Sequence, residues 1–563
     1  MELSVYRKSM EQELDSYYST FDPCTEPLLQ KLQQLAEECT DVSSYERKTR
    51  TYELLTEECP VHLFKENDFF FEISSGRPRH SWGGLQSPVG CFWNNRTADQ
   101  WIHPYLHEVQ EDMDEAFLHT YNPVSIDHHC PGYDTLLRLG LNGIIQKTEE
   151  KLAACNDLKK QEFYRCVIRA NKALLRLAER FKEEACRLAA AASSPEEKAH
   201  FEKIAAAAEN VPANPPATFY EGMCTVLFYR ECVGSIDGIG FSTFGQLDRM
   251  LLPLYEADLA TGRTTPEEAQ ALIAQLLLYT EVRFEAATGY YETSTTIELG
   301  GCDRDGNIIY NPLTELILDT VLALRTVNTK INCRISKAHP KAYLEKISRL
   351  QMAELPTVMM HNDDVLIPAR TRFGQSVEDA RMYVGGGCHE IVLQGTEVCT
   401  RADTWISLPR ILLQTMATAA ECCTYEDFYR QFTADVKAYH EKITAIKNKS
   451  EKRWCEMSPL VLYSSTIDGC LEQGMDVTEG GAKYSTVTLS MLGTATMIDS
   501  LYAIRQIVFE DKKLTLADFL RIVKNNFAVT VKSNICKNIT KKRIQDLRFC
   551  FLVLHYHCRI VYY

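Results

Sequence analysis

The stretch Gly385–Glu390, which reads GGGCHE, holds the residue types in this chain that most directly suggest chemistry. Glycines have no Cβ, so the backbone there can turn sharply and approach a ligand closely. In extended backbone, the two-residue spacing of Cys388 and Glu390 would point both side chains to one side. The spacing predicts a reactive sulfur and an acid–base carboxylate that face one cavity. The alternative is a glycine-rich turn with a buried structural cysteine and a solvated glutamate.

Composition limits the classes of protein to which the chain can belong. It has 563 residues and a formal net charge of −15, from 61 basic and 76 acidic side chains, which argues against a role at nucleic acid or a membrane surface. Its 21 cysteines follow no repeating framework, and the start MELSVYRKSM lacks the apolar core of a secretion signal. We therefore expect reduced thiols and a cytoplasmic protein. No apolar run is long enough to predict a membrane span.

The order of predicted elements indicates the fold class. Residues 1–60 and 135–210 have helical patterns, whereas 61–135 are rich in turn signals. From residue 217 onward, helices alternate with short segments that we predict as strands, at 295–299, 330–335, 356–360 and 391–394. This alternation predicts an α/β architecture in which helices enclose a sheet. No internal repeat or low-complexity linker interrupts the pattern, so we expect one large domain.

The end of the chain departs from this pattern. No glycine follows Gly493, no proline follows Pro459, and the apolar spacing after Phe527 fits neither a helix nor a clean strand. We interpret residues 1–527 as the domain and residues 528–563 as an atypical, non-native tail. An ordinary C-terminal pair of strands is the alternative.

Several separate blocks of the sequence resemble the glycyl radical enzymes, the family that includes pyruvate formate-lyase and the diol dehydratases. The blocks follow the family's order and extend to about residue 527. They are His129–Tyr133, Val211–Glu221, Gly245–Asp248, Gly300–Gly301, Asp305–Gly306, Asn332–Arg334, Asn362–Asp364, Gly387–Glu390, Gly480–Tyr484 and Asp499–Leu501. The resemblance implies a ten-stranded α/β barrel, made of two five-stranded half-barrels and wrapped by helices, with its C-terminal part missing.

The resemblance also implies roles for two residues of the glycine-rich stretch. In the family, a separate radical-SAM activating enzyme installs a radical on a glycine near the C-terminus. That radical takes hydrogen from a cysteine, and the resulting thiyl takes hydrogen from a small-molecule substrate. Cys388 is then the thiyl carrier and Glu390 the general base. A closed cavity would protect the thiyl and would raise the pKa of the carboxyl toward neutrality, which suits proton transfer.

The residue before Cys388 favours one branch of the family. Pyruvate formate-lyase uses two adjacent cysteines, but here Gly387 precedes Cys388, so acyl transfer of the formate C-acetyltransferase type is the less favoured alternative. The pattern is more similar to the eliminating lyases, which include diol dehydratases, choline lyase, hydroxyproline dehydratase and some arylacetate decarboxylases. His389 stands where these enzymes usually have valine. It either faces the cavity or points away and hydrogen-bonds locally.

Other polar residues in matching regions are candidates for binding substrate. By resemblance they are His129, Asp237, Ser242 and Asp403, together with His389. Alternatively, Asp237 and Asp403 cap a local turn and a helix. The adjacent cysteine and histidine pairs match no zinc spacing, so we predict no bound metal. The resemblance implies an organic glycyl radical and no bound cofactor.

The radical glycine of the family lies in an Arg-Val-x-Gly-aromatic motif, which this sequence does not contain. Two hypotheses follow. The chain is either a lyase of anaerobic metabolism that is inactive until another polypeptide supplies the radical, or a truncated, non-catalytic barrel. The family resemblance further implies a homodimer and an activating enzyme as partners, with no nucleic acid and no membrane involved.

Overall fold

The computed structural model describes residues 3–19, 25–72, 79–81, 84–86, 129–237, 243–288, 295–326, 329–355, 357–387 and 390–525. The chain forms two compact units. The first contains residues 1–102, 125–400 and 453–487, and the second contains 103–124, 401–452 and 488–563. The predicted tail, 528–563, lies outside the described residues, so its interpretation stays a prediction.

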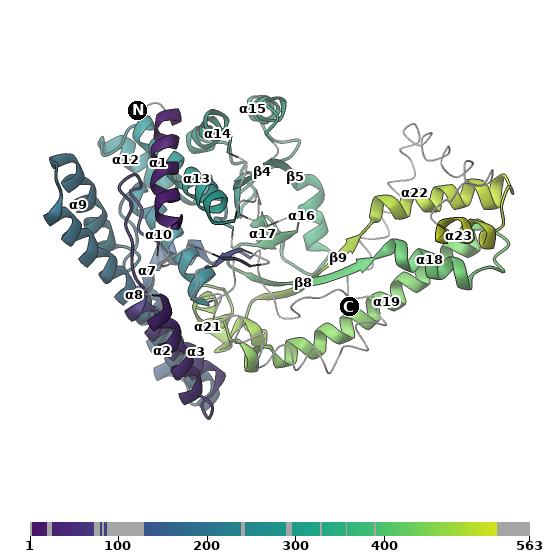
Figure 1. The fold of residues 1–563 in the computed structure, drawn as a ribbon, viewed down its shortest axis with the longest axis horizontal. Coiled ribbons are helices and arrows are strands. Elements are labelled where there is room, and N and C mark those ends of the chain that lie inside the picture. The colour runs from purple at the N-terminus through teal and green to yellow at the C-terminus, as the bar shows by residue number, and fades with distance from the viewer. Residues whose placement is uncertain are drawn as a thin grey trace. The chain divides into compact units, whose positions relative to one another are not determined.

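Helices make up most of the N-terminal half of the first unit (Figure 1). In α9, Ser194 accepts a hydrogen bond from the backbone N–H of Glu197 at 3.1 Å and Pro195 follows in the first turn, as its sequence predicts. The helices are α1 (Leu3–Ser19), α2 (Thr25–Glu38), α3 (Ser44–Glu58), α7 (Tyr133–Ala153), α8 (Leu158–Ala191), α9 (Pro195–Asn210), α10 (Phe219–Cys232), η2 (Val233–Asp237), α11 (Leu247–Met250), α12 (Leu252–Thr261) and α13 (Pro266–Thr288).

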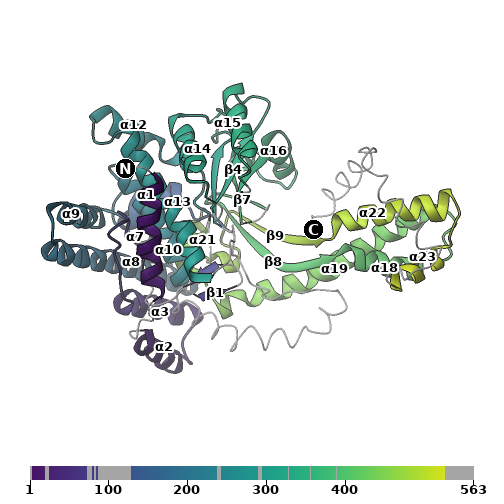
Figure 2. The same cartoon turned by 45° about the horizontal axis from the view of Figure 1, so that its top comes forward.

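A parallel sheet lies at the centre of the first unit. Its strands are β3 (Thr295–Gly300), β4 (Thr329–Ile335) and β5 (Val358–Asn362), in the order β3-β4-β5. Helices α14 (Pro312–Leu324) and α15 (Lys341–Met352) make the crossovers that parallel strands require, and α16 (Asp363–Thr371) follows β5 directly. Figures 1 and 2 show these helices around the sheet. The strands predicted at 295–299, 330–335 and 356–360 are confirmed within two residues.

Side chains of the two sheet faces alternate along β3 and β4. Ile297, Leu299, Ile331 and Cys333 are buried on one face, where apolar contact with helices stabilises the sheet. The residues between them are polar or charged. The second face of this sheet is therefore a polar surface inside the first unit.

An antiparallel hairpin follows the sheet. Its strands are β6 (Tyr383–Gly385) and β7 (Ile391–Leu393), and Tyr383 pairs with Leu393 and Gly385 with Ile391. The short helix α17 (Val377–Ala380) precedes it. The chain between the two strands is the glycine-rich stretch with Cys388 and Glu390. The remaining short elements of this unit are β1 (Arg79–Ser81), β2 (Gly84–Gln86), α20 (Val461–Ser464), α21 (Cys470–Gln473) and η3 (Val477–Glu479).

The second unit has its own apolar core. Phe428, Ile411, Met497 and Phe519, for example, are each less than a twentieth exposed and belong to one cluster. Its helices are α18 (Leu408–Thr418), α22 (Thr494–Ile504), η4 (Arg505–Glu510), α23 (Leu516–Lys524) and most of α19 (Tyr425–Met457). Strands β8 (Glu397–Ser407) and β9 (Tyr484–Leu492) pair with each other, and each begins in the first unit and ends in the second. Among the described helices of both units, none has the length and apolar content that crossing a membrane would need.

Candidate active site

The hairpin holds Glu390 through its own backbone. The N–H of Gly387 donates to Glu390 Oε1 at 3.0 Å, and the N–H of Gly386 donates to the Glu390 carbonyl at 2.8 Å. The carboxylate, predicted as the general base, is thus bound to the turn in which Cys388 lies two positions earlier. Cys388 and His389 themselves lie outside the described residues.

Polar side chains of β3 and β4 hold the hairpin on the sheet. The Glu298 carboxylate accepts the N–H of Gly385 at 2.7 Å, and the Thr296 hydroxyl donates to the Gly385 carbonyl at 2.9 Å. The ammonium of Lys330 donates to the carbonyl of Gly387. Both backbone polar groups of Gly385 are therefore satisfied by side chains of the sheet, which hold this residue in place.

A buried ion pair contacts Tyr383, the first residue of β6. Arg334 is fully buried and donates from Nε and Nη2 to the two oxygens of Asp363, each at 2.9 Å. Its Nη1 donates to the carbonyl of Tyr383 at 3.2 Å, and its guanidinium lies 4.1 Å from the centre of the Tyr383 ring. A planar guanidinium suits this combination of a bidentate carboxylate and an aromatic face.

Two further polar side chains, those of Asn332 and His361, pack closely on Gly385. A Cβ placed on Gly385 would stand 2.1 Å from Nδ2 of Asn332 and 2.7 Å from Cε1 of His361. His361 Nδ1 lies 3.3 Å from Glu298 Oε1. Burial lowers the pKa of His361, but the charge of Glu298 and its hydrogen bond outweigh this and raise the pKa above the ordinary value of 6.5.

Of the candidates for substrate binding, His129 and Asp237 come together around one tyrosine. The ring of His129 is fully buried and meets the Tyr463 ring edge-on, with centroids 4.6 Å apart. Asp237 accepts the N–H of Tyr463 at 2.9 Å and the hydroxyl of Tyr52, and Lys48 Nζ lies 3.9 Å from its Oδ1. Burial raises the pKa of Asp237 to about 6, and the nearby Lys48 opposes this. Substrate contact by either residue stays a prediction.

The other candidates cannot be placed. Ser242 lies outside the described residues, as Cys388 and His389 do. Asp403 belongs to β8, but its side chain is not among those described.

Sequence reasoning missed the polar residues of the sheet that hold the hairpin. Glu298, Lys330 and His361 were assigned no role. The alternation of polar and apolar residues in 295–300 and 329–335 marks Glu298 and Lys330, whereas His361 lies in β5, outside both segments. Polar side chains at every second position of a buried strand indicate a face that serves something other than the apolar core. That signal is visible in the sequence, but the partner of the face is not.

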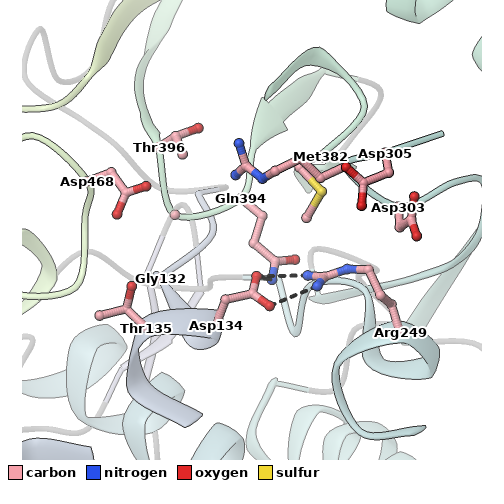
Figure 3. A pocket seen from close by; sticks show the side chains of 12 residues that line it. Gly132, Asp134, Thr135, Arg249, Asp303, Asp305, Met382, Gln394, Thr396 and Asp468 are labelled. Atoms are coloured by element: carbon pink, nitrogen blue, oxygen red, sulfur yellow. Dashed lines mark hydrogen bonds and ion pairs between the residues drawn. The ribbon is translucent and has the colours of Figure 1, made fainter. Parts of the chain in front are cut away.

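A cavity of about 330 Å³ lies next to the open end of the hairpin (Figure 3). Its lining includes Met382, which precedes β6, and Gln394, which follows β7. Arg249 donates to both oxygens of Asp134 at 2.8 Å, and Nε2 of Gln394 also donates to Asp134 at 2.8 Å. These polar groups of the wall therefore satisfy one another. The lining residues are Gly132, Asp134, Thr135, Arg249, Asp303, Arg304, Asp305, Met382, Gln394, Gly395, Thr396 and Asp468. Within the described part of the chain, no three histidine, cysteine or carboxylate side chains are grouped as metal ligands.

Comparison with known proteins defines the class. The family model described as pyruvate formate lyase-like matches residues 85–542. The chain therefore belongs to the pyruvate formate lyase-like family of glycyl radical enzymes, which confirms the resemblance seen in its motifs. The match extends past residue 527, into the segment interpreted as a tail.

Curated relatives include dehydratases and a lyase. The chain is 26% identical to (2S)-3-sulfopropanediol dehydratase of Klebsiella oxytoca over 80% of this chain and 59% of the relative. It is 25% identical to trans-4-hydroxy-L-proline dehydratase of Clostridioides difficile, over 81% of this chain and 62% of the relative. Isethionate sulfite-lyase of Nitratidesulfovibrio vulgaris is 25% identical over 70% of this chain and 52% of the relative. The chain thus spans less than two thirds of the length of these relatives.

Solved structures support the fold class. The B12-independent glycerol dehydratase of Clostridium butyricum matches with a TM-score of 0.80 and 20% identity, over 93% of this chain and 73% of that chain. A Roseburia inulinivorans structure described for 1,2-propanediol dehydration matches with a TM-score of 0.82 and 19% identity, over 95% and 74%. The predicted α/β barrel class is confirmed by these likenesses. Within the described residues, the parallel strands β3, β4 and β5 form the parallel sheet of this fold.

Proposed function

We propose that this chain is the barrel part of a glycyl radical lyase that cleaves a C–O, C–N or C–C bond of a small polar substrate. The observation that carries the proposal is the hairpin β6–β7, which has Cys388 and Glu390 in its turn and is bound to a polar sheet face at Gly385 and Gly387. The chain's membership of a family of radical enzymes supports the role of the Cys388 sulfur as the thiyl carrier.

The proposed reaction uses one sulfur and one carboxylate of this chain. A thiyl at Cys388 takes a hydrogen atom from a substrate carbon, which gives a thiol and a carbon radical. Glu390 then takes the proton of the neighbouring hydroxyl while the leaving group departs with its bonding electrons, and Glu390 passes that proton to the departed group, so the carboxylate is restored. The product radical takes the hydrogen atom back from the thiol, so the thiyl is restored. The carboxylate keeps the hydrogen bond from the Gly387 N–H during the cycle, which orients it.

The radical glycine must reach Cys388 from sequence that is not in residues 1–563, because the Arg-Val-x-Gly-aromatic motif is not found there. In this proposal the missing glycine belongs either to a longer form of the chain or to a second polypeptide. A radical-SAM activating enzyme and a second copy of the chain are proposed partners. The named substrates of the relatives suggest the classes to test, which are diols, sulfonates and hydroxyproline.

Reconstitution tests the proposal. The chain is combined anaerobically with an activating enzyme and a polypeptide carrying a glycyl radical domain, and the radical is quantified by electron paramagnetic resonance. Product is then measured for 3-sulfopropanediol, hydroxyproline, isethionate, glycerol, 1,2-propanediol and choline. We expect turnover of one of these classes, its loss in Cys388→Ala, and no change in a Cys423→Ala control at an exposed thiol.

Two outcomes would oppose the proposal. Turnover that survives in Cys388→Ala would remove the sulfur from the mechanism. A full glycyl radical signal without turnover of any substrate class would favour the non-catalytic barrel.

A further inference from the structure

The Glu298 carboxylate joins the hairpin to a histidine of the sheet. Glu298 is fully buried, and its two oxygens have different partners. Oε2 accepts the Gly385 N–H at 2.7 Å, whereas Oε1 lies 3.3 Å from Nδ1 of His361. A buried carboxylate is costly unless it is paired and hydrogen-bonded. The proton on His361 therefore bears directly on how strongly Glu298 holds Gly385.

His361, which contacts Glu298, is itself enclosed by the protein. The side chain is 7% exposed and its Nε2 has no hydrogen-bond partner. The Asn332 amide, whose Nδ2 and Oδ1 also have none, lies beside the imidazole, because both abut the same point on Gly385. An amide oxygen next to an imidazole can accept its second N–H after a small rotation, which would satisfy both buried groups.

Other charged groups face the pair from neighbouring elements. Lys330 and Arg334 belong to the same face of β4 as Asn332, and Asp363 begins α16. Arg334 and Asp363 neutralise each other through their bidentate contact. Tyr383 of β6 presents its ring, with a centroid 6.1 Å from that of His361. The direct contact with Glu298 is therefore the interaction that a proton on His361 changes most.

We propose that Glu298 and His361 form a positioning pair for the β6–β7 hairpin, in which protonated His361 keeps the Glu298 carboxylate where it accepts the Gly385 N–H. Loss of that proton leaves a buried carboxylate with a weaker hold on Gly385. The stability from this pair is fully present below the ordinary histidine pKa of 6.5. It is lost as the pH rises through the raised pKa of His361. The hairpin that bears Cys388 is therefore bound most firmly at lower pH.

The inference rests on the proposed function only for the importance of Cys388. Its test measures the hairpin itself and needs no radical, substrate or turnover. A negative activity assay would therefore not contradict the Glu298–His361 pair, and a negative exchange experiment would not contradict the proposed reaction.

Hydrogen exchange with mass spectrometry tests the pair in the full chain. Protection of peptides that cover residues 383–393 is measured at about pH 5.5 and about pH 8.5, on either side of the ordinary histidine pKa. Intrinsic exchange is corrected for pH. We expect wild-type protection to fall about tenfold at the higher pH, the loss that corresponds to one hydrogen bond to a charged acceptor. Peptides from α8 should show no such fall.

Two variants and a control decide the outcome. His361→Gln cannot be protonated, and Glu298→Gln keeps an acceptor for Gly385 without the charge, so both should show low protection that does not vary with pH. His339→Gln is the matched control, because His339 is 6% exposed and its hydrogen bonds run to Gly301 and Ser336, away from the hairpin. It should follow the wild type.

Persistence of the pH step in either variant would overturn the proposal, and so would its absence in the wild type. If His361→Gln also loses protection in α8, that variant is unfolding, and Glu298→Gln decides by the same criterion.

Discussion

Arg334 and Asp363 form a bidentate pair that is almost fully buried, with both N–O distances at 2.9 Å. The pair lies at the junction of three elements, since Arg334 is in β4, Asp363 begins α16 and the same guanidinium donates to the carbonyl of Tyr383 in β6. One ion pair therefore fixes the base of the hairpin to the sheet. This contact holds Tyr383, at the start of the hairpin, against the sheet.

Breaking this pair should cost much of the stability of the first unit. Asp363→Asn leaves the buried guanidinium without its counter charge, and we expect a loss of about 3–5 kcal/mol in the free energy of unfolding. Urea titration measures it. In the control Glu345→Gln, the exposed pair Lys341–Glu345 at 3.1 Å is broken, and the change should stay within about 0.5 kcal/mol. Equal effects of the two substitutions would contradict the structural role of Asp363.

Gly385 should tolerate no side chain. In Gly385→Ala the new Cβ would stand 2.1 Å from Asn332 Nδ2 and 2.7 Å from His361 Cε1, so these groups must move. We expect the substitution to destabilise the fold by about 2–3 kcal/mol, as overpacking does. The control Gly143→Ala lies in α7, where the nearest atom is the Leu139 Cβ at 3.0 Å, and should change stability by no more than about 1 kcal/mol. A thermal melt of Gly385→Ala that matches the wild type would show that the sheet does not pack on this glycine.

Asp248 should make stability depend on pH. It is fully buried, and burial raises its pKa from 3.8 to about 6, although the Gly300 N–H and the Thr314 hydroxyl donate to it. A raised pKa means that the folded state binds the proton more tightly, so the benefit is present below pH 3.8 and is lost as the pH rises through about 6. Relative to Asp248→Asn, which does not titrate, the wild type should lose about 2 kcal/mol between about pH 4.5 and about pH 7.5.

Urea titrations of the wild type and Asp248→Asn at both pH values measure this difference, because all other titrating groups are common to the two proteins. A stability difference that stays constant across the range would exclude a raised pKa for Asp248.

The cap of α9 gives a local test of the fold. Ser194→Ala removes the acceptor of the Glu197 N–H, so we expect a loss of about 1 kcal/mol. Ser348→Ala is the control, since Ser348 is exposed in α15 and bonds only to the carbonyl of Leu344 among the described groups. Chemical denaturation should separate the two. A smaller loss for Ser194→Ala than for Ser348→Ala would contradict the cap.

Glu390→Gln tests the general base in the reconstituted assay. The amide oxygen can still accept the Gly387 N–H, so the turn keeps its shape, but the side chain can no longer take a proton. We expect kcat to fall by about 10²–10⁴, the usual contribution of general base catalysis, while the glycyl radical signal is unchanged. Undiminished turnover would assign the base to another residue.

Local features of this fold could be predicted because they depend on neighbours in sequence. The cap at Ser194, strand segments 295–299 and 330–335, and the glycine-rich turn at Gly385–Glu390 follow from residue type, alternation and absent Cβ atoms. The division into two units was not predicted, because contacts between distant segments define it. The environment of Asp237 could not be predicted either, since Tyr463, whose N–H donates to it, is 226 positions away.

By itself, the sequence determined the family, the α/β class and the place of Cys388 and Glu390 in one glycine-rich stretch, because motif order and local spacing are read along the chain. Only the tertiary structure decided that Glu298 and His361 support that stretch. Glu298 lies 87 positions from Gly385 and 63 from His361. The parallel register of β3, β4 and β5 brings Glu298 close to His361, and hydrogen bonds from Glu298 and Thr296 of β3 hold Gly385 of β6 there. Such register is set by the packing of crossover helices on the sheet, which no local pattern specifies.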